Sequence, residues 1–425
     1  MHPLKKLTCR AFQLAFRLAL PVLPYREPKQ LDGLDSIPPL LKGRGVGSVL
    51  LVTDQSVRSL GLTVPLEESL AAEGIACAVY DGTVPNPTIQ NVEEGRRLYL
   101  DSGAQAIIAV GGGSVMDCAK GVGARIARPR KPVRRMKGLL RVLLPTPLTI
   151  AVPTTAGTGS EATLAAVITD PEKKHKYPIN DFALIPDYAV LDPKITLGLP
   201  PFITATTGMD ALTHAIEAYI GRTTTKLTRA MSEEAARLIV QNLPRAFADG
   251  TDLEARRAML RAAYCAGVSF TRSYVGYVHG LAHSLGGQYG VPHGLANAVI
   301  LPYFLEEYGP ACWEKLGKLA KAAGLAQEGD SAQKSALAFI TWIKEANRSM
   351  GIPETIAELR AGDIPAMARH ADQECNPLYP VPRLMDRREL ETMYQKLMAK
   401  EESPWISRPL SRTSGPISKP ARRLA

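Results

Sequence analysis

Several features that would place this chain in a specialised class are missing. The 425-residue sequence has no run of about 18 apolar residues. Its six cysteines include no C-x-x-C pair. A transmembrane helix needs the first feature, and zinc ribbons and dithiol redox sites use the second. We therefore expect no transmembrane segment, and the scattered cysteines predict reduced thiols and a cytoplasmic location.

The composition also lacks the bias of a disordered or fibrous chain. Hydrophobic residues make up 45% and charged residues 22%, which is ordinary for a globular protein of two or three domains. The net charge of +10 would by itself suggest an anionic partner. However, residues 125–141 and 403–425 together hold thirteen basic residues and no acidic one, so the remainder has a net charge of −3. The charge therefore belongs to two appendages, and we expect no specific nucleic-acid partner.

Residues 1–40 form a basic amphipathic N-terminal extension. The stretch at 4–20 starts with two lysines, as a secretion signal does, but Gln13 and Arg17 interrupt its apolar part. No A-x-A-like cleavage site follows Leu20. A basic amphipathic helix fits better. We favour a helix that is docked on the body of the protein, with weak contact to a membrane surface as the alternative.

From residue 41 to 203 the sequence predicts an α/β domain. Short apolar runs alternate with amphipathic segments such as 88–103 and 114–127, and these runs lie at 48–54, 76–81, 106–112 and 148–154. This alternation predicts a Rossmann-like parallel sheet that is covered by helices. Further β character at 164–170 and 188–192 completes this half of the chain.

The second half has helical periodicity only. From 204 to about 400 the pattern predicts an all-α domain, with helix breaks at Gly221, Gly250 and 290–293. Residues 401–425 follow as a basic tail that we expect to be disordered.

A glycine-rich turn follows the third apolar run. Gly112, Gly113 and Ser114 open a helix, where backbone N–H groups can approach and attract a phosphate. A plain tight turn is the alternative. The first strand–helix turn lacks glycine, so the standard dinucleotide fingerprint is absent and the phosphates should lie further along the sheet. In that first turn, Asp54 can bind a ribose 2′-hydroxyl and favour NAD, or it can cap the helix that follows.

A second loop after a strand, PTTAGTGSE at 153–161, combines hydroxyl groups with flexible glycines. It suits a pyrophosphate or a ribose, and with the glycine-rich turn it indicates a dinucleotide.

Four of the seven histidines fall in two clusters of the helical half. Asp210 and His214 are four residues apart, as are His279 and His283, and His293 follows. Residues four apart share a helix face. One carboxylate with neutral imidazoles is a ligand set for Fe(II), Zn(II) or a similar ion. Spacing alone does not decide which three histidines bind. One turn further on the first helix, Glu217 is a candidate partner of a ligand.

Five segments together resemble the iron-containing (group III) alcohol dehydrogenase family, which includes lactaldehyde reductases, propanediol dehydrogenases and butanol dehydrogenases. They lie at 81–88, 111–120, 153–163, 207–219 and 278–302. The resemblance implies a dehydroquinate synthase-like architecture, in which an α/β dinucleotide-binding domain precedes an all-α metal-binding domain. It also implies a homodimer or larger assembly.

The resemblance also assigns roles to individual residues. It implies that the metal ligands are Asp210, His214, His279 and His293. It makes His283 a catalytic residue near the nicotinamide, for proton relay or substrate orientation. It places the cofactor against Asp54, Asn86, Gly112, Gly113, Ser114, Thr154, Thr155, Thr158 and Lys176. Among these, Lys176 has the weakest match.

The implied activity is hydride transfer between NAD(P) and a primary alcohol or aldehyde, with Fe(II) polarising the substrate oxygen. NADP and zinc remain alternatives for cofactor and metal. A zinc-dependent polyol enzyme of the glycerol dehydrogenase type and a non-enzymatic polyanion-binding protein remain alternatives for the function. Arg272 and Tyr274 depart from the family pattern, and we expect them close to the substrate cavity, where their size argues against a simple short-chain alcohol.

Overall fold

The N-terminal half is built on one parallel sheet. The computed structural model describes residues 1–172 and 175–399, and six strands lie in the order β1-β9-β6-β4-β2-β3, all paired in parallel. The predicted runs form β2 (Ser48–Val52), β3 (Ala76–Tyr80), β4 (Ala106–Gly111), β6 (Leu148–Pro153) and β9 (Tyr188–Val190). The α/β prediction is confirmed.

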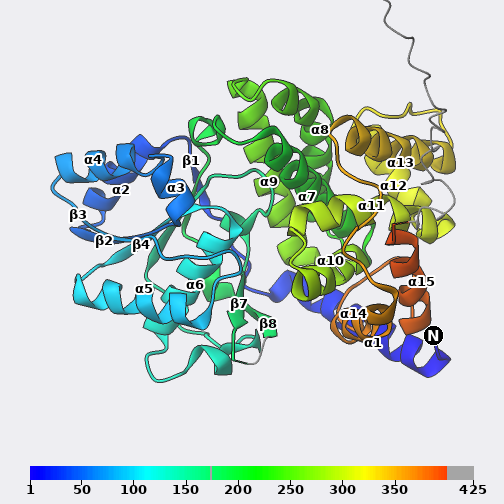
Figure 1. Cartoon of the computed structure of the whole chain (residues 1–425), viewed down its shortest axis with the longest axis horizontal. Helices are drawn as coiled ribbons and strands as arrows, with labels where there is room; N and C mark the ends of the chain where they lie inside the picture. Colours follow the sequence, from blue (N-terminus) through cyan, green and yellow to red (C-terminus); the bar gives the residue numbers. More distant parts are fainter. Residues whose placement is uncertain (173–174, 400–425) are drawn as a thin grey trace, which may run out of the picture.

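Helices cover both faces of this sheet (Figure 1). On one face α2 (Ile37–Gly43), α3 (Gln55–Ser59) and α4 (Val64–Ala72) pack against Val49 and Leu51. On the other face α5 (Ile89–Asp101) and α6 (Gly113–Ala127) pack against Leu50 and Val52. Because successive side chains of a strand point to opposite faces, a strand covered on both sides must be apolar throughout. This explains the continuous apolar runs.

Two strands differ from the expectation. The run at 164–170 forms β7 (Ala165–Asp170), which pairs antiparallel with β8 (His175–Asn180) in a separate sheet completed by β5 (Gly138–Leu139). Its residues alternate between buried and half-buried, as in a strand covered on one face only. The edge of the main sheet is β1 (Lys29–Leu31), a strand of the N-terminal extension that the sequence analysis did not identify.

The C-terminal half is helical, as predicted. Its longer elements are α7 (Pro201–Ile220), α8 (Lys226–Ala248), α9 (Leu253–Ser273), α10 (Tyr277–Tyr289), α11 (His293–Tyr308), α12 (Pro310–Ala322), α13 (Ala332–Ser349), α14 (Ile364–Cys375) and α15 (Arg387–Leu397). Gly221 ends α7, Gly250 follows α8, and α10 and α11 meet at 290–293, so the three predicted breaks are present. Nearly every residue of α7 from Thr204 onward is buried.

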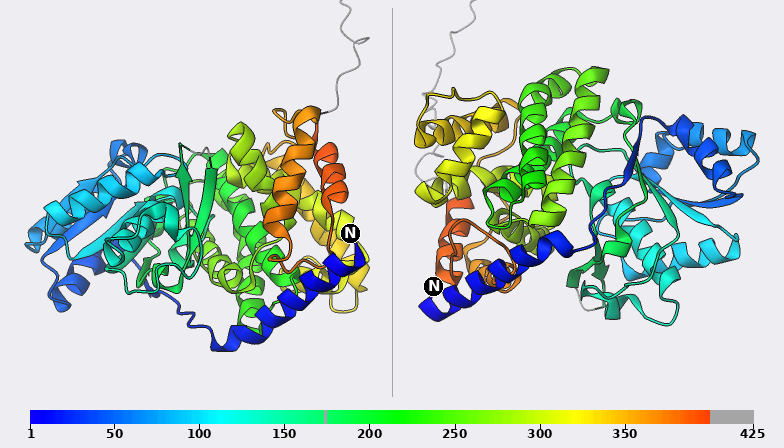
Figure 2. Two further views of the ribbon diagram at one scale, coloured as in Figure 1. Left: turned by 90° about the horizontal axis from the view of Figure 1, so that it is seen from below. Right: turned by 180° about the vertical axis from the view of Figure 1, so that it is seen from behind.

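The N-terminal extension docks on the helical half before it reaches the sheet (Figure 2). Its helix α1 (Pro3–Ala19) buries Cys9, and Gln13 Nε2 donates to the carbonyl of Tyr379 at 2.7 Å. Lys5 pairs with Asp372 of α14 at 2.7 Å. No helix in the described part of the chain is long and apolar enough to cross a bilayer. The tail expected at 401–425 lies outside the described residues.

The loop at 153–163 touches the helical half through two glycines. Gly159 has φ +59°, and a Cβ on it would lie 2.6 Å from the carbonyl oxygen of Ala263 in α9. A Cβ on Gly267 of α9 would lie 2.5 Å from the carbonyl oxygen of Gly159. The two backbones are therefore closer than any side chain permits.

This contact predicts a specific loss of stability. Gly61 also has a positive φ, +68°, but a Cβ there meets nothing within 4 Å. Gly61→Ala should therefore cost only the backbone strain, about 1–2 kcal/mol. Gly159→Ala should cost roughly 1–3 kcal/mol more, because the loop and α9 must separate. Chemical denaturation measures both, and equal losses in the two variants would contradict the close contact.

Candidate metal centre and cofactor site

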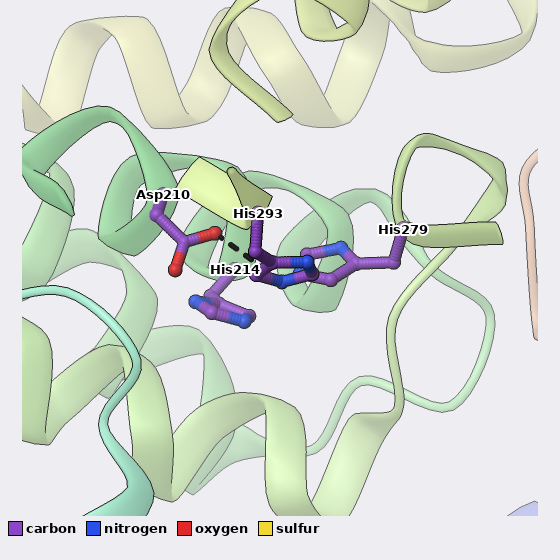
Figure 3. Close-up of side chains that lie close together, drawn as sticks. All are labelled: Asp210, His214, His279 and His293. Carbon is purple, nitrogen blue, oxygen red and sulfur yellow. Dashed lines mark ion pairs between the residues drawn. The ribbon is translucent and has the colours of Figure 1, made fainter. Parts of the chain in front are cut away.

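Four donor side chains converge in the interior of the helical half (Figure 3). Asp210 and His214 come from α7, His279 from α10 and His293 from the first residue of α11. One ligand atom of each lies within 4.8 Å of the others. Tetrahedral ligands about 2.1 Å from an ion lie roughly 3.5 Å apart, so a modest approach completes a site. Of the four histidines in the two sequence clusters, His283 is the one outside this group.

The three imidazoles of the group are held neutral. Burial lowers the pKa of His214, lowers that of His279 well below its usual value, and lowers that of His293 to about 3. Neutral imidazoles offer the lone pairs that a divalent ion needs. The backbone of Gly157 interacts with the buried His214 ring, and a ring nitrogen engaged in this way leaves the other nitrogen for a ligand. The donor chemistry therefore fits a divalent metal.

Glu217 orients one of these ligands. Its carboxylate accepts hydrogen bonds from His279 Nδ1 at 2.6 Å and from the backbone N–H groups of Gly276 at 2.8 Å and Val278 at 2.9 Å. Burial acts to raise the pKa of Glu217, and the hydrogen bonds from the backbone N–H groups act in the opposite direction and favour the carboxylate. With Nδ1 donating to Glu217, His279 presents Nε2 to the other ligands.

Asn297 is a member of the site that the sequence analysis missed. Its side-chain nitrogen lies 2.6 Å from Asp210 Oδ1, 3.2 Å from His279 Nε2 and 3.1 Å from His293 Nε2. It follows His293 by four residues, so the helix spacing used for the histidines identifies it as a neighbour. Its contacts with three of the four donor residues keep them near one another.

His283 lies beside the group and faces another partner. Its ring stacks on that of His293 with centroids 5.4 Å apart, and its Nδ1 lies 2.6 Å from Glu374 Oε1 in α14. The same oxygen accepts a hydrogen bond from the Tyr379 hydroxyl at 2.7 Å. The sequence analysis did not identify Glu374, which is distant in sequence and belongs to no spacing pattern with His283.

The candidate cofactor residues lie at the carboxyl ends of the main strands. Asp54 follows β2, and Gly112, Gly113 and Ser114 follow β4. Strands β3 and β4 lie on opposite sides of β2, and dinucleotides bind where the strand order reverses in this way. Asp54 Oδ1 accepts the backbone N–H of Val57 at 2.9 Å, so the helix-capping role is present.

The two candidate phosphate loops face each other. A Cβ on Gly113 would lie 2.9 Å from Cγ2 of Thr158, and one on Gly112 would lie 3.6 Å from Oγ1 of Thr155. The backbone N–H of Thr154 donates to the carbonyl of Gly111 at 3.1 Å. Small residues in one loop therefore admit the hydroxyl side chains of the other.

Lys176, the weakest match in the sequence, is brought to this region. Its Nζ donates to Asn86 Oδ1 at 2.6 Å, and the Asn86 backbone N–H donates to Ser114 Oγ at 3.3 Å. The charge of Lys176 is also close enough to interact with Glu374 and His293. It therefore lies between the candidate cofactor residues and the metal ligands.

Lys120 of α6 is a further residue that the sequence analysis did not single out. Its buried Nζ donates to five oxygens of residues 160–165, among them the Ser160 carbonyl at 2.6 Å and Thr163 Oγ1 at 2.9 Å. Burial lowers its pKa to about 8, against the attraction of Asp117 and Glu161. Lys120 thus fixes the loop that carries Thr154, Thr155 and Thr158.

Arg272 and Tyr274 contact the N-terminal extension. Arg272 pairs with Glu27 at 3.0 Å, and the Tyr274 ring packs edge-on against Phe16 with centroids 5.0 Å apart. Tyr274 adopts φ +62°, which is unusual for a bulky residue, and its ring lies 6.4 Å from that of Tyr379. It is therefore linked to His283 through Tyr379 and Glu374.

The orienting role of Glu217 leads to a test. Glu217→Gln keeps the shape but replaces an anionic acceptor, and loss of such a partner typically lowers metal affinity 10–100-fold. Titration with a competing chelator would measure this. Glu233→Gln is the matched control, because Glu233 binds Tyr219 at 2.7 Å outside the donor group. Unchanged metal affinity in Glu217→Gln would contradict the orienting role.

Comparisons with known proteins identify the family. The model described as "Iron-containing alcohol dehydrogenase" matches residues 30–193, and "Fe-containing alcohol dehydrogenase family, C-terminal" matches 204–398. Lactaldehyde reductase of Escherichia coli K12 is 39% identical over 339 residues, covering 79% of this chain and 88% of that protein. The crystal structure of a 1,3-propanediol oxidoreductase superposes with a TM-score of 0.84 at 35% identity, covering 88% of this chain and 99% of the other. Sulfoacetaldehyde reductase from Bifidobacterium kashiwanohense, solved with NAD⁺, gives 0.79 at 27% identity, covering 88% and 98%. The resemblance seen in the sequence is thus confirmed, and the chain belongs to the iron-containing alcohol dehydrogenase family.

Proposed function

We propose that the protein is an NAD-dependent alcohol dehydrogenase or aldehyde reductase of the iron-containing type. The observation that carries this is the buried group of one carboxylate and three neutral imidazoles. Family membership supports it, as does the NAD⁺ in the related sulfoacetaldehyde reductase. A non-enzymatic polyanion binder would not need such a group.

Asp210, His214, His279 and His293 would hold the metal, with Glu217 and Asn297 maintaining their positions. A divalent ion bound there acts as a Lewis acid toward an alcohol or carbonyl oxygen. The choice of Fe(II) follows the family, and zinc, as in polyol enzymes of the glycerol dehydrogenase type, is the alternative that metal analysis separates.

We assign proton transfer to His283. Its Nδ1 is engaged by Glu374, so Nε2 is the atom that would exchange a proton with the substrate hydroxyl. The negative charge of Glu374 would stabilise the imidazolium that results. The same carboxylate accepts a hydrogen bond from the Tyr379 hydroxyl. Although burial acts to raise it, the pKa of Glu374 is lowered by the charge of His283 and by these hydrogen bonds.

For the cofactor, we assign the pyrophosphate to the facing loops and the adenosine ribose to Asp54. The phosphate contacts would come from Gly112, Gly113, Ser114, Thr154, Thr155 and Thr158, with Asn86 and Lys176 next to them. Hydride transfer itself is the chemistry of the nicotinamide. This arrangement implies domains at 41–203 and 204–400 that share one reaction site.

Two assignments, of cellular location and of oligomeric state, accompany this proposal. All six cysteines are free, which supports a reducing cytoplasmic environment. A homodimer or larger assembly is proposed from the family alone.

Metal dependence can be tested with matched histidine variants. His279→Ala and His293→Ala should lose bound metal and aldehyde reduction together after anaerobic purification. His370→Ala should keep both, because His370 is an exposed residue of α14 outside the donor group. Metal content and NADH oxidation with a panel of aldehydes provide the readout. Full turnover in His279→Ala with no bound metal would refute the proposal.

Cofactor choice can be tested at Asp54. Asp54→Asn keeps an acceptor for the Val57 N–H but removes the charge that would repel a 2′-phosphate. The ratio of kcat/KM for NAD to that for NADP should fall by roughly tenfold or more, the effect of about 1.4 kcal/mol. Steady-state kinetics with both cofactors measures this. An unchanged ratio would show that Asp54 serves only as a helix cap.

A further inference from the structure

Helix α1 exposes an apolar stripe to solvent. Leu4, Leu7, Leu14 and Leu18 are 67%, 67%, 56% and 72% exposed, and Ala11 between them is exposed as well. The steps of three, four, three and four residues place all five on one face of the helix. Single exposed leucines are common on protein surfaces, but a continuous stripe marks an interaction site.

The opposite face of α1 fixes its orientation. Cys9 and Gln13 are buried there, and Arg10 donates to the carbonyls of Val381 and Pro382 at 2.8 and 2.9 Å. These polar contacts hold the helix on the domain and leave the leucines outside. Figure 2 shows α1 running along the outside of the helical half.

The surroundings of the stripe are positively charged. Residues 1–26 contain five lysines and arginines and no acidic residue. Near the end of α1, Arg17 lies in a group with Arg222, Arg229 and Lys315, and no ion pair in the described part of the chain joins these four to a carboxylate. Burial and repulsion by the three arginines lower the pKa of Lys315 to about 8.

Two carboxylates of this region have partners of their own, and one of them, Glu314, also attracts Lys315. Glu314 pairs with Lys318 at 2.9 Å, and Glu233 accepts the hydroxyl of Tyr219 at 2.7 Å. Lys315 itself donates to the carbonyls of Ile220 and Gly221 at the end of α7. The three arginines therefore carry the positive charge that pairs with no carboxylate in the described part of the chain.

We propose that this face of α1 binds an anionic lipid surface. A helix with leucines on one side and cations along its flank lies in the plane of a membrane interface, with the apolar side among the acyl chains and the cations at the headgroups. A second copy of the chain would fit less well. Symmetric antiparallel pairing of the stripe would bring Arg17 of one copy toward Lys5 and Lys6 of the other, so cations would meet cations. The assignment is independent of the catalytic chemistry.

The stripe can be tested by vesicle sedimentation of the full chain. Wild-type protein should sediment with phosphatidylcholine vesicles that contain phosphatidylglycerol, and much less with phosphatidylcholine alone. The double variant Leu7→Glu/Leu14→Glu should bind at least roughly tenfold more weakly. Leu60→Glu/Leu100→Glu is the matched control, because those leucines are 68% and 52% exposed elsewhere. It should bind like the wild type, and aldehyde reduction should be unchanged in both variants.

The charge is tested by Arg17→Gln/Arg222→Gln. Each cation near an anionic surface contributes about a fivefold gain in binding, so the double variant should also lose tenfold or more and should be less sensitive to salt. Equal binding to neutral and anionic vesicles, or full binding by Leu7→Glu/Leu14→Glu, would overturn the proposal. So would a change of sedimentation coefficient in that variant without lipid, since it would show that the stripe joins two copies.

Discussion

The requirement to keep four candidate metal-binding donors, three of them buried, neutral or paired governs the helical half. Three imidazoles and a carboxylate in an apolar interior are unfavourable unless each lone pair and N–H group has a partner. Here α7 supplies Asp210 and His214 from within the core, and α10 and α11 supply the other two ligands around a tight break at 290–293. Glu217 can be buried because it accepts three hydrogen bonds. These bonds also hold His279 and the start of α10 in place.

The loop at 153–163 joins this site to the sheet. Lys120 holds its far end through five hydrogen bonds, Gly159 rests on α9, and the backbone of Gly157 interacts with His214. The same loop presents Thr155 and Thr158 to the glycine turn after β4. A single segment therefore fixes the distance between the candidate phosphate contacts and the metal ligands. Hydride transfer requires such a fixed distance, because the reacting carbon atoms must meet at about 3–3.5 Å.

Local patterns in the sequence were enough for much of this arrangement. The strands covered on both faces are short apolar runs, so β2 and β4 could be identified directly. The candidate metal ligands Asp210 and His214 follow the four-residue spacing of a helix face, so their proximity could be predicted as well. Contacts between distant segments could not. Glu374 reaches His283 across 91 residues, and β1 pairs with β9, which is far along the chain. The residues of these two interactions follow no periodic pattern or fixed spacing in the sequence, because each interaction depends on tertiary packing. The antiparallel β7–β8 hairpin was missed as a separate sheet because a β-rich run does not reveal its partner.

Helix α1 shows a further limit of sequence periodicity. The pattern of leucines and cations predicts an amphipathic helix, and the usual expectation is that the leucines face the protein. Here a mixed side docks. Cys9 is buried and Phe16 packs against Tyr274, while Gln13 and Arg10 donate to backbone carbonyls at 377–382. The energy of those hydrogen bonds is modest, about 1–3 kcal/mol each where a charge is involved. Burying the leucines on the same surface would leave the carbonyls without partners. Which face of an amphipathic helix turns inward therefore depends on the surface it meets, and the apolar face left outside is available to a different environment.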